Sequence, residues 1–199
     1  MEINVKMEIN ENSFPFLVRV GNFADAAFLV TYRGVNPNTI IDSEEGTTAL
    51  FYVAGKKGGL DFAKALIEKG ANVNERASNY TPLHYAIMAE DKELIDLLIS
   101  KGAKVNDDKY SVFFCVKNVE MAEFLISKGA DINFLDSYNR NPLYIAVKIN
   151  RKELVEFFIN KGTQLNIKDR YDSTPLDITT SDEIKQILIN AGAKSGKDL

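Results

Sequence analysis

A seven-residue segment that recurs along the chain constrains its fold more than any other feature. Clear copies are EKGANVN at 68–74, SKGAKVN at 100–106, SKGADIN at 127–133 and NKGTQLN at 160–166, and weaker copies begin at Tyr32 and Asn190. A glycine that follows an apolar helical run ends the helix, because glycine adopts the left-handed conformation that closes the last turn. A lysine before it suits the negative end of the helix dipole. The segment therefore predicts a series of helix ends.

A second motif precedes each of these ends. TPLHYA at 81–86 recurs as NPLYIA at 141–146 and TPLDI at 174–178, with degenerate copies from Thr48 and Ser111. A threonine N-cap followed by proline at the first helical position is typical of a helix start. Between start and end lie two apolar runs with helical spacing, as at 83–88 and 94–99. Two short helices cannot bury both apolar faces alone, so neighbouring units must stack.

TPLHYA, the GANVN tail and a period near 33 residues resemble the ankyrin repeat family. The resemblance implies an all-α fold, an ankyrin-repeat solenoid of stacked helix–turn–helix units with projecting β-turn-like loops. It covers residues 13–193, between an N-terminal extension at 1–12 and a tail at 194–199 that we expect to fray. The expected units, six in all, are 13–38, 44–74, 78–106, 108–133, 137–166 and 170–193.

The sequence departs from the family pattern in two places. The linker at 37–45 carries extra residues before Thr48, and the fourth unit is short in its loop at 107–110 and again between its helices at 117–118. Two explanations of the short unit stay open. The missing residues leave a notch floored by Tyr110 and Phe114 and flanked by Tyr80 and Tyr138, in which a peptide binds. Alternatively the repeat has drifted, and Phe113 and Phe114 are buried to compensate.

The end units are expected to be caps, because their outer faces have no neighbour. Thr180 and Glu183 fit a capping box at the start of the final helix. On that helix the polar side chains Lys185, Gln186 and Asn190 are expected to face outward. The apolar side chains Ile184, Ile187 and Leu188 are expected to face inward.

The chain offers little material for catalysis. His84 is its only histidine and Cys115 its only cysteine, and no nucleotide-binding, zinc or nucleophile-elbow motif is present. His84 stands third in the first helix of TPLH, where the resemblance implies a structural imidazole. Cys115 lies in the apolar run VFFCV, which predicts a buried, unreactive thiol. We therefore expect no enzyme activity, no catalytic residue, no metal site and no cofactor.

Charge and hydropathy limit the classes of partner that this chain is expected to bind. The net charge of −4 argues against a nucleic-acid surface, which needs clustered excess Lys and Arg. No apolar stretch approaches the roughly 18 residues of a membrane span, and the acidic start MEINVKMEINENSF does not resemble a secretion signal. A single cysteine forbids an intrachain disulfide and fits a reducing compartment. We expect a cytoplasmic monomer, while export into a host cell stays open.

The resemblance implies that projecting loops and first helices line one concave face, on which the partner binds. Carried over by register, the partner-binding positions are Asn79, Tyr80, Met88, Lys109, Tyr110, Tyr138, Arg140, Lys148, Arg170 and Tyr171. Tyrosine and arginine dominate this set, as they dominate interface hot spots. In the alternative interpretation, the tyrosines pack loop against loop and contact no partner.

The predicted function is a non-enzymatic protein–protein interaction module. One alternative is a regulatory or targeting subunit of an enzyme system, or an effector acting on host proteins. Another is a small-molecule binder or a cryptic enzyme that uses the notch.

Overall fold

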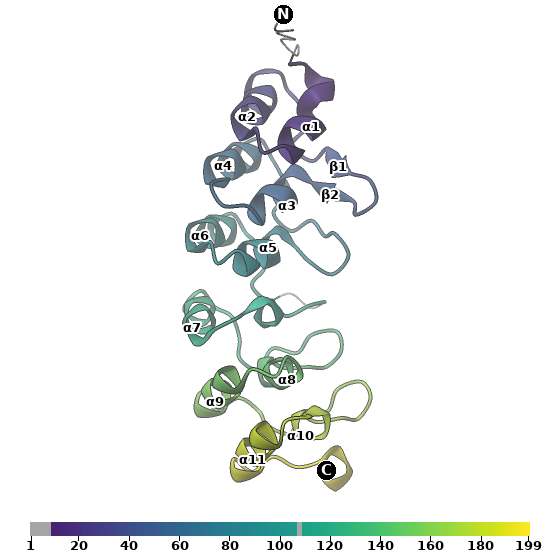
Figure 1. Ribbon diagram of the computed structural model, residues 1–199, viewed down its shortest axis with the longest axis vertical. Helices are drawn as coiled ribbons and strands as arrows, with labels where there is room; N and C mark the ends of the chain where they lie inside the picture. The colour runs from purple at the N-terminus through teal and green to yellow at the C-terminus, as the bar shows by residue number, and fades with distance from the viewer. Residues whose placement is uncertain (1–8, 107–108) are drawn as a thin grey trace, which may run out of the picture. The chain divides into compact units, whose positions relative to one another are not determined.

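The computed structural model describes residues 9–106 and 109–199. It divides into two compact units, Met1–Ala103 (unit 1) and Lys104–Leu199 (unit 2). Within each unit, short helices follow one another as pairs joined by tight turns, and loops project from one side of the pairs (Figure 1). The predicted all-α fold class is confirmed, while the exact number and bounds of the repeats stay predictions.

Unit 1 contains two parallel rows of helices. Its elements are η1 (Glu11–Ser13), α1 (Phe14–Arg19), α2 (Phe23–Tyr32), β1 (Ile40–Asp42), β2 (Thr47–Thr48), α3 (Ala49–Ala54), α4 (Leu60–Glu68), α5 (Pro82–Met88) and α6 (Lys92–Ser100). The first helices α1, α3 and α5 pack in one row, and the second helices α2, α4 and α6 pack in the other. Each first helix also packs on the second helix that follows it.

Unit 2 repeats this arrangement with one weak element. Its elements are η2 (Val112–Cys115), α7 (Val119–Ser127), α8 (Pro142–Lys148), α9 (Lys152–Asn160), α10 (Pro175–Ile178), α11 (Asp182–Asn190) and η3 (Gly196–Asp198). The first-helix row runs η2, α8, α10 and the second-helix row runs α7, α9, α11. A short 3₁₀ segment, η2, takes the place of a first helix, which agrees with the shortened fourth unit.

The predicted helix starts and ends are confirmed. Thr81, Asn141 and Thr174 are the N-caps of α5, α8 and α10, each followed by proline in the first turn. The glycines of the recurring segment all have positive φ, between 71° at Gly34 and 94° at Gly129. After α6, the Ala103 N–H bonds back to the Leu98 carbonyl at 2.9 Å, which closes the last turn.

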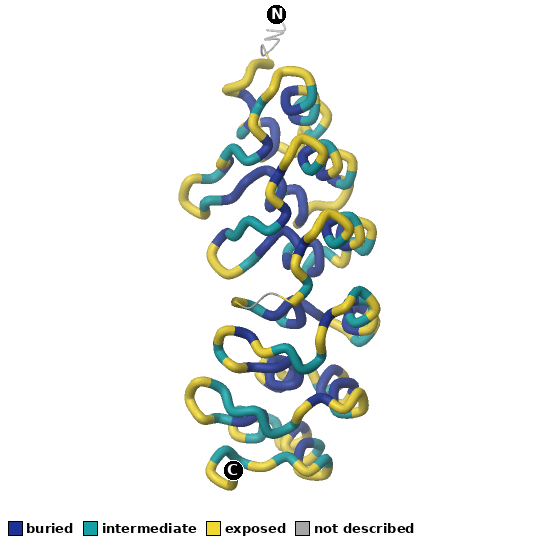
Figure 2. The backbone as a smooth tube through the Cα atoms, turned by 180° about the vertical axis from the view of Figure 1, so that it is seen from behind, coloured by how far each residue is buried: buried dark blue, intermediate teal, exposed yellow. Residues whose placement is uncertain are grey.

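The core lies between the two helix rows of each unit. Figure 2 shows the inward sides of the helices buried and the loop tips exposed. In unit 1, Leu83 and Ile87 of α5 and Leu94, Ile95 and Leu98 of α6 are all fully buried. Burying one such side chain contributes about 1.5–3 kcal/mol, so the shared apolar surface outweighs the weak intrinsic stability of four- to ten-residue helices.

An asparagine ladder explains why the recurring segment ends in Asn. In unit 1, the Asn38 amide donates to the Gly70 carbonyl at 3.1 Å and accepts from the Asn72 N–H at 2.8 Å. In unit 2, Asn106 makes the same two bonds to Gly129 at 3.0 Å and Asp131 at 2.9 Å. An amide carries both a donor and an acceptor, so one side chain fixes two backbone groups of the next segment.

The extra residues before Thr48 form a β-hairpin that the sequence did not predict. β1 pairs antiparallel with β2, and Ile40 lies opposite Thr48. The Asp42 carboxylate accepts the backbone N–H groups of Glu44 at 2.9 Å and Glu45 at 3.3 Å, which closes the turn. The expected linker is therefore an ordered projection.

The short fourth repeat is filled by aromatic packing. Phe113 is buried and meets Phe158 edge-on, with ring centroids 5.2 Å apart. Phe114 is half-buried, and its ring centroid lies 4.6 Å from that of Tyr110. These contacts favour the drift explanation. The notch stays a prediction, because Asp107 and Asp108 lie outside the described residues and Tyr80 belongs to unit 1.

Two expectations at the C-terminal end are wrong in detail. The N-cap of α11 is Ser181, not Thr180, because the Ser181 hydroxyl accepts the Ile184 N–H at 3.3 Å. The tail does not fray, because Asp177 accepts the Ser195 hydroxyl at 2.6 Å and the Gly196 N–H at 2.8 Å. Along α11 itself, Ile184 and Leu188 are buried, Ile187 is half-buried, and Lys185, Gln186 and Asn190 are exposed, as predicted.

A cap was expected at the N-terminal end of unit 1, but large apolar side chains are exposed there. Phe16 and Val20 of α1 are 44% and 57% exposed, and Phe28 of α2 is 46% exposed. Of the expected extension at 1–12, residues 1–8 lie outside the described residues, and Asn10 caps η1.

Candidate protein-binding surface

Two neighbouring loops of unit 2 are built on the same plan around an aspartate. In the loop before α8, the Asp136 carboxylate accepts the N–H groups of Tyr138 at 2.9 Å and Arg140 at 3.1 Å. In the loop before α10, Asp169 accepts those of Tyr171 at 2.9 Å and Ser173 at 3.0 Å. An aspartate that bonds the backbone two residues on stabilises a turn. Tyr138 and Tyr171 are therefore held at equivalent positions by rigid local geometry.

Direct hydrogen bonds join these loops to one another. The Arg170 N–H donates to the Tyr138 carbonyl at 3.1 Å, and the Asn139 amide donates to the Lys168 carbonyl. On the other side, the Ser137 hydroxyl donates to the Lys109 carbonyl at 3.0 Å. The loops of unit 2 therefore form a continuous row and not a set of independent tips.

Arg140 is buried beneath this row and does not face solvent. It is 5% exposed, and its Nε and Nη2 atoms donate to Asp136 Oδ2 at 2.9 and 2.6 Å. Its guanidinium carbon lies 4.5 Å from the ring centroid of Tyr138 and 5.9 Å from that of Tyr110. The family resemblance predicts Arg140 as a partner contact, but its burial makes it a support for the tyrosines.

The solvent-facing part of the row combines tyrosine with positive charge. Tyr171 is 73% exposed, although a tyrosine ring is large and mostly apolar. The exposed Arg170 has its guanidinium carbon 4.4 Å from the Tyr138 ring centroid and 5.9 Å from that of Tyr171. The tyrosine–arginine surface, as we name it, comprises Lys109, Tyr110, Tyr138, Arg170 and Tyr171.

A buried tyrosine supports this surface from the helix below. Tyr144 of α8 is 3% exposed, and its hydroxyl donates to Asp169 Oδ2 at 2.6 Å. Burial, followed by this bond, raises the pKa of Tyr144. Partial burial alone would raise the pKa of Asp169, but the bonds from Tyr144, Ser173 and Tyr171 hold it below its usual value. The sequence did not predict this pair. The feature that could have indicated it is Tyr144, which occupies the position that His84 has in the motif TPLH.

The remaining predicted partner residues lie elsewhere. In unit 1, Asn79 is exposed and its carbonyl accepts from Arg76 at 3.3 Å, while Tyr80 is half-buried with its ring edge-on to His84 and Tyr85. Met88 and Lys148 are the last residues of α5 and α8, at the opposite end of each helix from its loop. These four residues are therefore not part of the tyrosine–arginine surface.

His84 and Cys115 have structural surroundings. His84 is fully buried, and its Nδ1 accepts the Thr81 N–H at 3.2 Å and lies 2.9 Å from the Thr81 hydroxyl. This pair caps α5, so the imidazole serves the helix start. Cys115 is buried, and burial raises the pKa of its thiol to about 12, an effect that Lys117 only partly offsets.

Neither a metal-binding cluster nor a membrane-spanning helix occurs in the described part of the chain. Across residues 9–106 and 109–199, no group of three or more His, Cys, Asp or Glu side chains is arranged to hold a metal ion. Over the same residues, no helix has the length and apolar character needed to cross a membrane.

Comparison with known proteins identifies the repeats. The family model described as "Ankyrin repeats (3 copies)" matches residues 16–109 and again 112–197. Among solved structures, the ankyrin repeat domain of Bcl-3, titled a unique member of the IkappaB protein family, is similar with a TM-score of 0.71. That match has 22% identity and covers 88% of this chain and 81% of the other, so it supports the fold alone. A comparison with curated proteins returns no match.

Proposed function

The chain belongs to the ankyrin repeat family, and we propose that it is a non-enzymatic module that binds another protein through the tyrosine–arginine surface of unit 2. Ankyrin repeats are in general protein–protein interaction modules. The observation that carries the choice of surface is Tyr171, which is 73% exposed on a loop whose backbone is fixed from beneath.

Preorganisation is the physical argument for this surface. A partner that binds a mobile loop must first order it, and that ordering weakens the complex. Here the buried Asp136–Arg140 pair and the Tyr144–Asp169 bond already fix the loops. Tyr138 and Tyr171 would then contribute large contact areas with little further loss of side-chain freedom.

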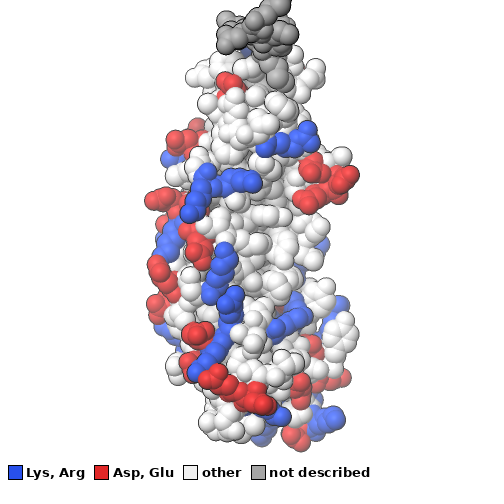
Figure 3. Space-filling model, in the orientation of Figure 1, with Lys and Arg blue, Asp and Glu red and all other residues white. Residues whose placement is uncertain are grey.

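The second helices of unit 2 form a weaker candidate surface. Figure 3 shows lysines, arginines and acidic residues mixed over these helices. In unit 2 they form exposed pairs, Lys152–Glu183 at 2.6 Å and Lys161–Glu123 at 3.7 Å. Exposed ion pairs contribute little, and an evenly mixed charged surface is typical of a solvated face.

The test compares the two tyrosines of the proposed surface with Tyr32 of unit 1, which is as exposed as Tyr171. Partners are cross-linked to the 199-residue chain in native cells and identified by mass spectrometry, and the affinity of the recovered protein is then measured by calorimetry. Tyr171→Ala combined with Tyr138→Ala should weaken binding by at least about 30-fold, the loss expected when a hot-spot residue is truncated. Tyr32→Ala is the control, because Tyr32 is 75% exposed on α2 of unit 1.

Equal affinity of the double variant and the Tyr32→Ala control would reject the surface. A regulatory subunit of an enzyme system and an effector acting on host proteins would use the same surface. The identity of the recovered protein separates these roles: an enzyme from the same cell supports the first, and a host protein supports the second.

A further inference from the structure

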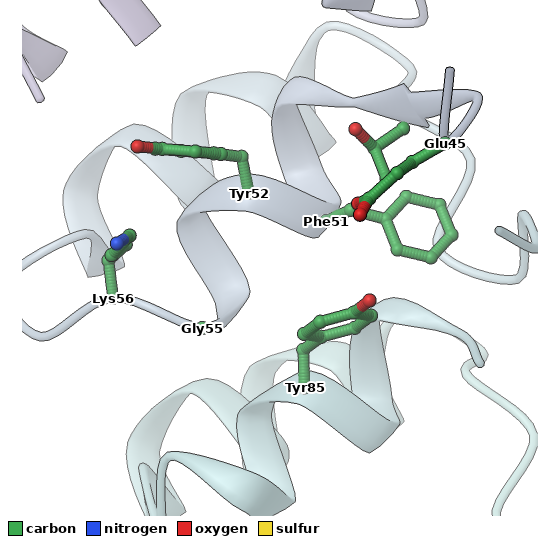
Figure 4. Close-up of a pocket in the computed structure, with 7 residues that line it drawn as sticks. Glu45, Phe51, Tyr52, Gly55, Lys56 and Tyr85 are labelled. Atoms are coloured by element: carbon green, nitrogen blue, oxygen red, sulfur yellow. The ribbon is translucent and has the colours of Figure 1, made fainter. Parts of the chain in front are cut away.

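A pocket in unit 1 lies where α3 and α5 meet the end of the β1–β2 hairpin (Figure 4). Its volume is about 250 Å³, and it is lined by Glu45, Thr47, Phe51, Tyr52, Gly55, Lys56 and Tyr85. Pockets that enclose small-molecule ligands are larger, about 300–1,000 Å³. The size therefore favours a single protruding side chain over a metabolite.

Aromatic rings from two successive first helices form the pocket walls. Phe51 of α3 and Tyr85 of α5 meet edge-on, with centroids 5.9 Å apart and ring planes at 84°. Phe51 is only 1% exposed, so it forms the floor, and Tyr85 rises from α5 beside it. Tyr52 is fixed because its hydroxyl donates to the Arg19 carbonyl at 2.8 Å. Phe51 and Tyr52 are therefore held in place before any ligand arrives.

The hairpin places negative charge at one end of this aromatic pocket. Glu45 stands beside Phe51 at the pocket edge, and Asp42 and Glu44 lie on the same hairpin. Acidic residues gather on this projection in Figure 3. At the opposite end, the Lys56 ammonium lies 5.2 Å from the Tyr52 ring centroid. A cation thus already rests on one aromatic ring of the pocket, which is the attraction expected of a ring face.

Unit 2 contains the same combination of groups with the cation supplied by the chain itself. There Arg140 lies between the carboxylate of Asp136 and the rings of Tyr138 and Tyr110. A planar guanidinium suits such a place, because it stacks on aromatic faces and donates in its plane to carboxylate oxygens. The pocket of unit 1 presents the carboxylate and the rings around an open volume.

We propose that this pocket receives an arginine side chain of the partner protein. The guanidinium lies against Tyr85 and Phe51 and donates to the Glu45 carboxylate and the Thr47 hydroxyl. This inference rests on the proposed function only in requiring that the ligand be a protein. It involves neither Tyr138 nor Tyr171, so the two proposals fail separately.

The test titrates the 199-residue chain with a blocked glycine pentapeptide that carries a central arginine. Binding is followed by NMR through the aromatic signals of Phe51 and Tyr85. A single side chain of this kind should bind with a Kd on the order of 1 mM. The same peptide with central citrulline, which keeps the shape but loses the charge, should bind at least about fivefold more weakly. A third peptide carries a central glutamate and probes the Lys56 end.

Adjacent glutamates give a matched pair of variants. Glu45→Gln should weaken the arginine peptide about two- to fivefold, the range for an exposed ion pair. Glu44→Gln removes the same charge from the next residue, which does not line the pocket, and should leave binding unchanged. Equal responses to arginine and citrulline, equal effects of the two variants, preference for the glutamate peptide, or no shift of Phe51 or Tyr85 would each overturn the proposal.

The arginine peptide could bind as expected while Tyr138→Ala with Tyr171→Ala has no effect on binding of the cellular partner. That result would support the pocket proposal and reject the tyrosine–arginine surface. The reverse pair of results removes the pocket and leaves the proposed function intact.

Discussion

In unit 2, the chain's own arginines contact the aromatic rings and the Asp136 carboxylate, whereas in unit 1 a similar set of groups surrounds an open pocket. In unit 2, Arg140 is paired with Asp136 at 2.6 Å and is 5% exposed. In unit 1, Glu45 is exposed at the edge of an aromatic pocket, and Lys56 lies at the far end. One repeat architecture therefore uses the same chemistry for stability in one place and leaves it available to a partner in another.

The difference follows from the cost of burying charge. An arginine removed from water destabilises the protein unless a carboxylate compensates it, so the Asp136–Arg140 pair must stay complete once it is buried. An exposed carboxylate such as Glu45 carries no such penalty and can await a partner's cation. Substitutions at the buried pair should therefore change stability, and substitutions at the pocket edge should change binding.

The largest expected effect tests the buried pair. Asp136→Ala leaves the Arg140 charge uncompensated and removes the acceptor of two loop N–H groups, so it should lower the free energy of unfolding by about 3–5 kcal/mol. Asp61→Ala in unit 1 is the control, because that side chain is 97% exposed in its pair with Lys64. Urea unfolding measures both, and the control should lose less than about 1 kcal/mol. Similar losses of unfolding free energy in the two variants would show that the buried pair contributes no more to stability than the exposed pair.

The second prediction concerns the turn between α3 and α4, next to the pocket. A Cβ on Gly59 would lie 2.1 Å from Val53 Cγ2 and 3.1 Å from the Val53 carbonyl oxygen. Gly59→Ala should therefore destabilise the protein by about 1–3 kcal/mol in urea unfolding. Gly55→Ala is the matched control, because its Cβ would meet Tyr85 at 3.6 Å, an ordinary contact. If both variants are neutral, the turn is less tightly packed than the structure indicates.

The third prediction asks whether the units open separately. Burial, which raises the pKa of Cys115 to about 12, should make its native-state reaction with a thiol reagent at pH 7.5 slow. Asp136→Ala should accelerate this reaction at least about tenfold by favouring local opening of unit 2. Gly59→Ala, in unit 1, should leave the rate nearly unchanged. Equal acceleration by both variants would mean that the units unfold together.

The smallest expected effect is a pH dependence of stability at Asp177 of unit 2, which occupies the position that His84 has in unit 1. Where α5 has His84, α10 has Asp177, which bonds Thr174 and the tail. Burial alone would raise the pKa of Asp177, but these bonds, from Ser195 foremost, hold it well below its usual value. The group therefore stabilises the fold above the ordinary aspartate pKa of about 3.9, and this contribution is lost as pH falls further.

Asp177→Asn should accordingly have a lower melting temperature than the wild type at pH 7, with the gap closing as pH falls below about 4. Melting curves of both proteins across this range measure it. A gap that stays constant with pH would show that the carboxylate charge plays no part.

The sequence by itself determined the helix starts, the helix ends and the fold class. Thr81–Pro82 and Gly102 act through their own backbone conformation and the hydrogen bonds of adjacent residues, so a local pattern suffices to identify them. The sequence pattern does not distinguish between two adjacent residues that can both serve as an N-cap, as with Thr180 and Ser181 before α11.

Only the tertiary structure decided which side chains face solvent. Arg140 and Arg170 both lie in tyrosine-bearing loops, yet Arg140 is buried because Asp136 and two tyrosines surround it. The Tyr144–Asp169 bond and the pocket between α3 and α5 likewise join residues from different repeats. Such contacts depend on how successive repeats stack, and burial is a property of that stack and not of the neighbouring sequence.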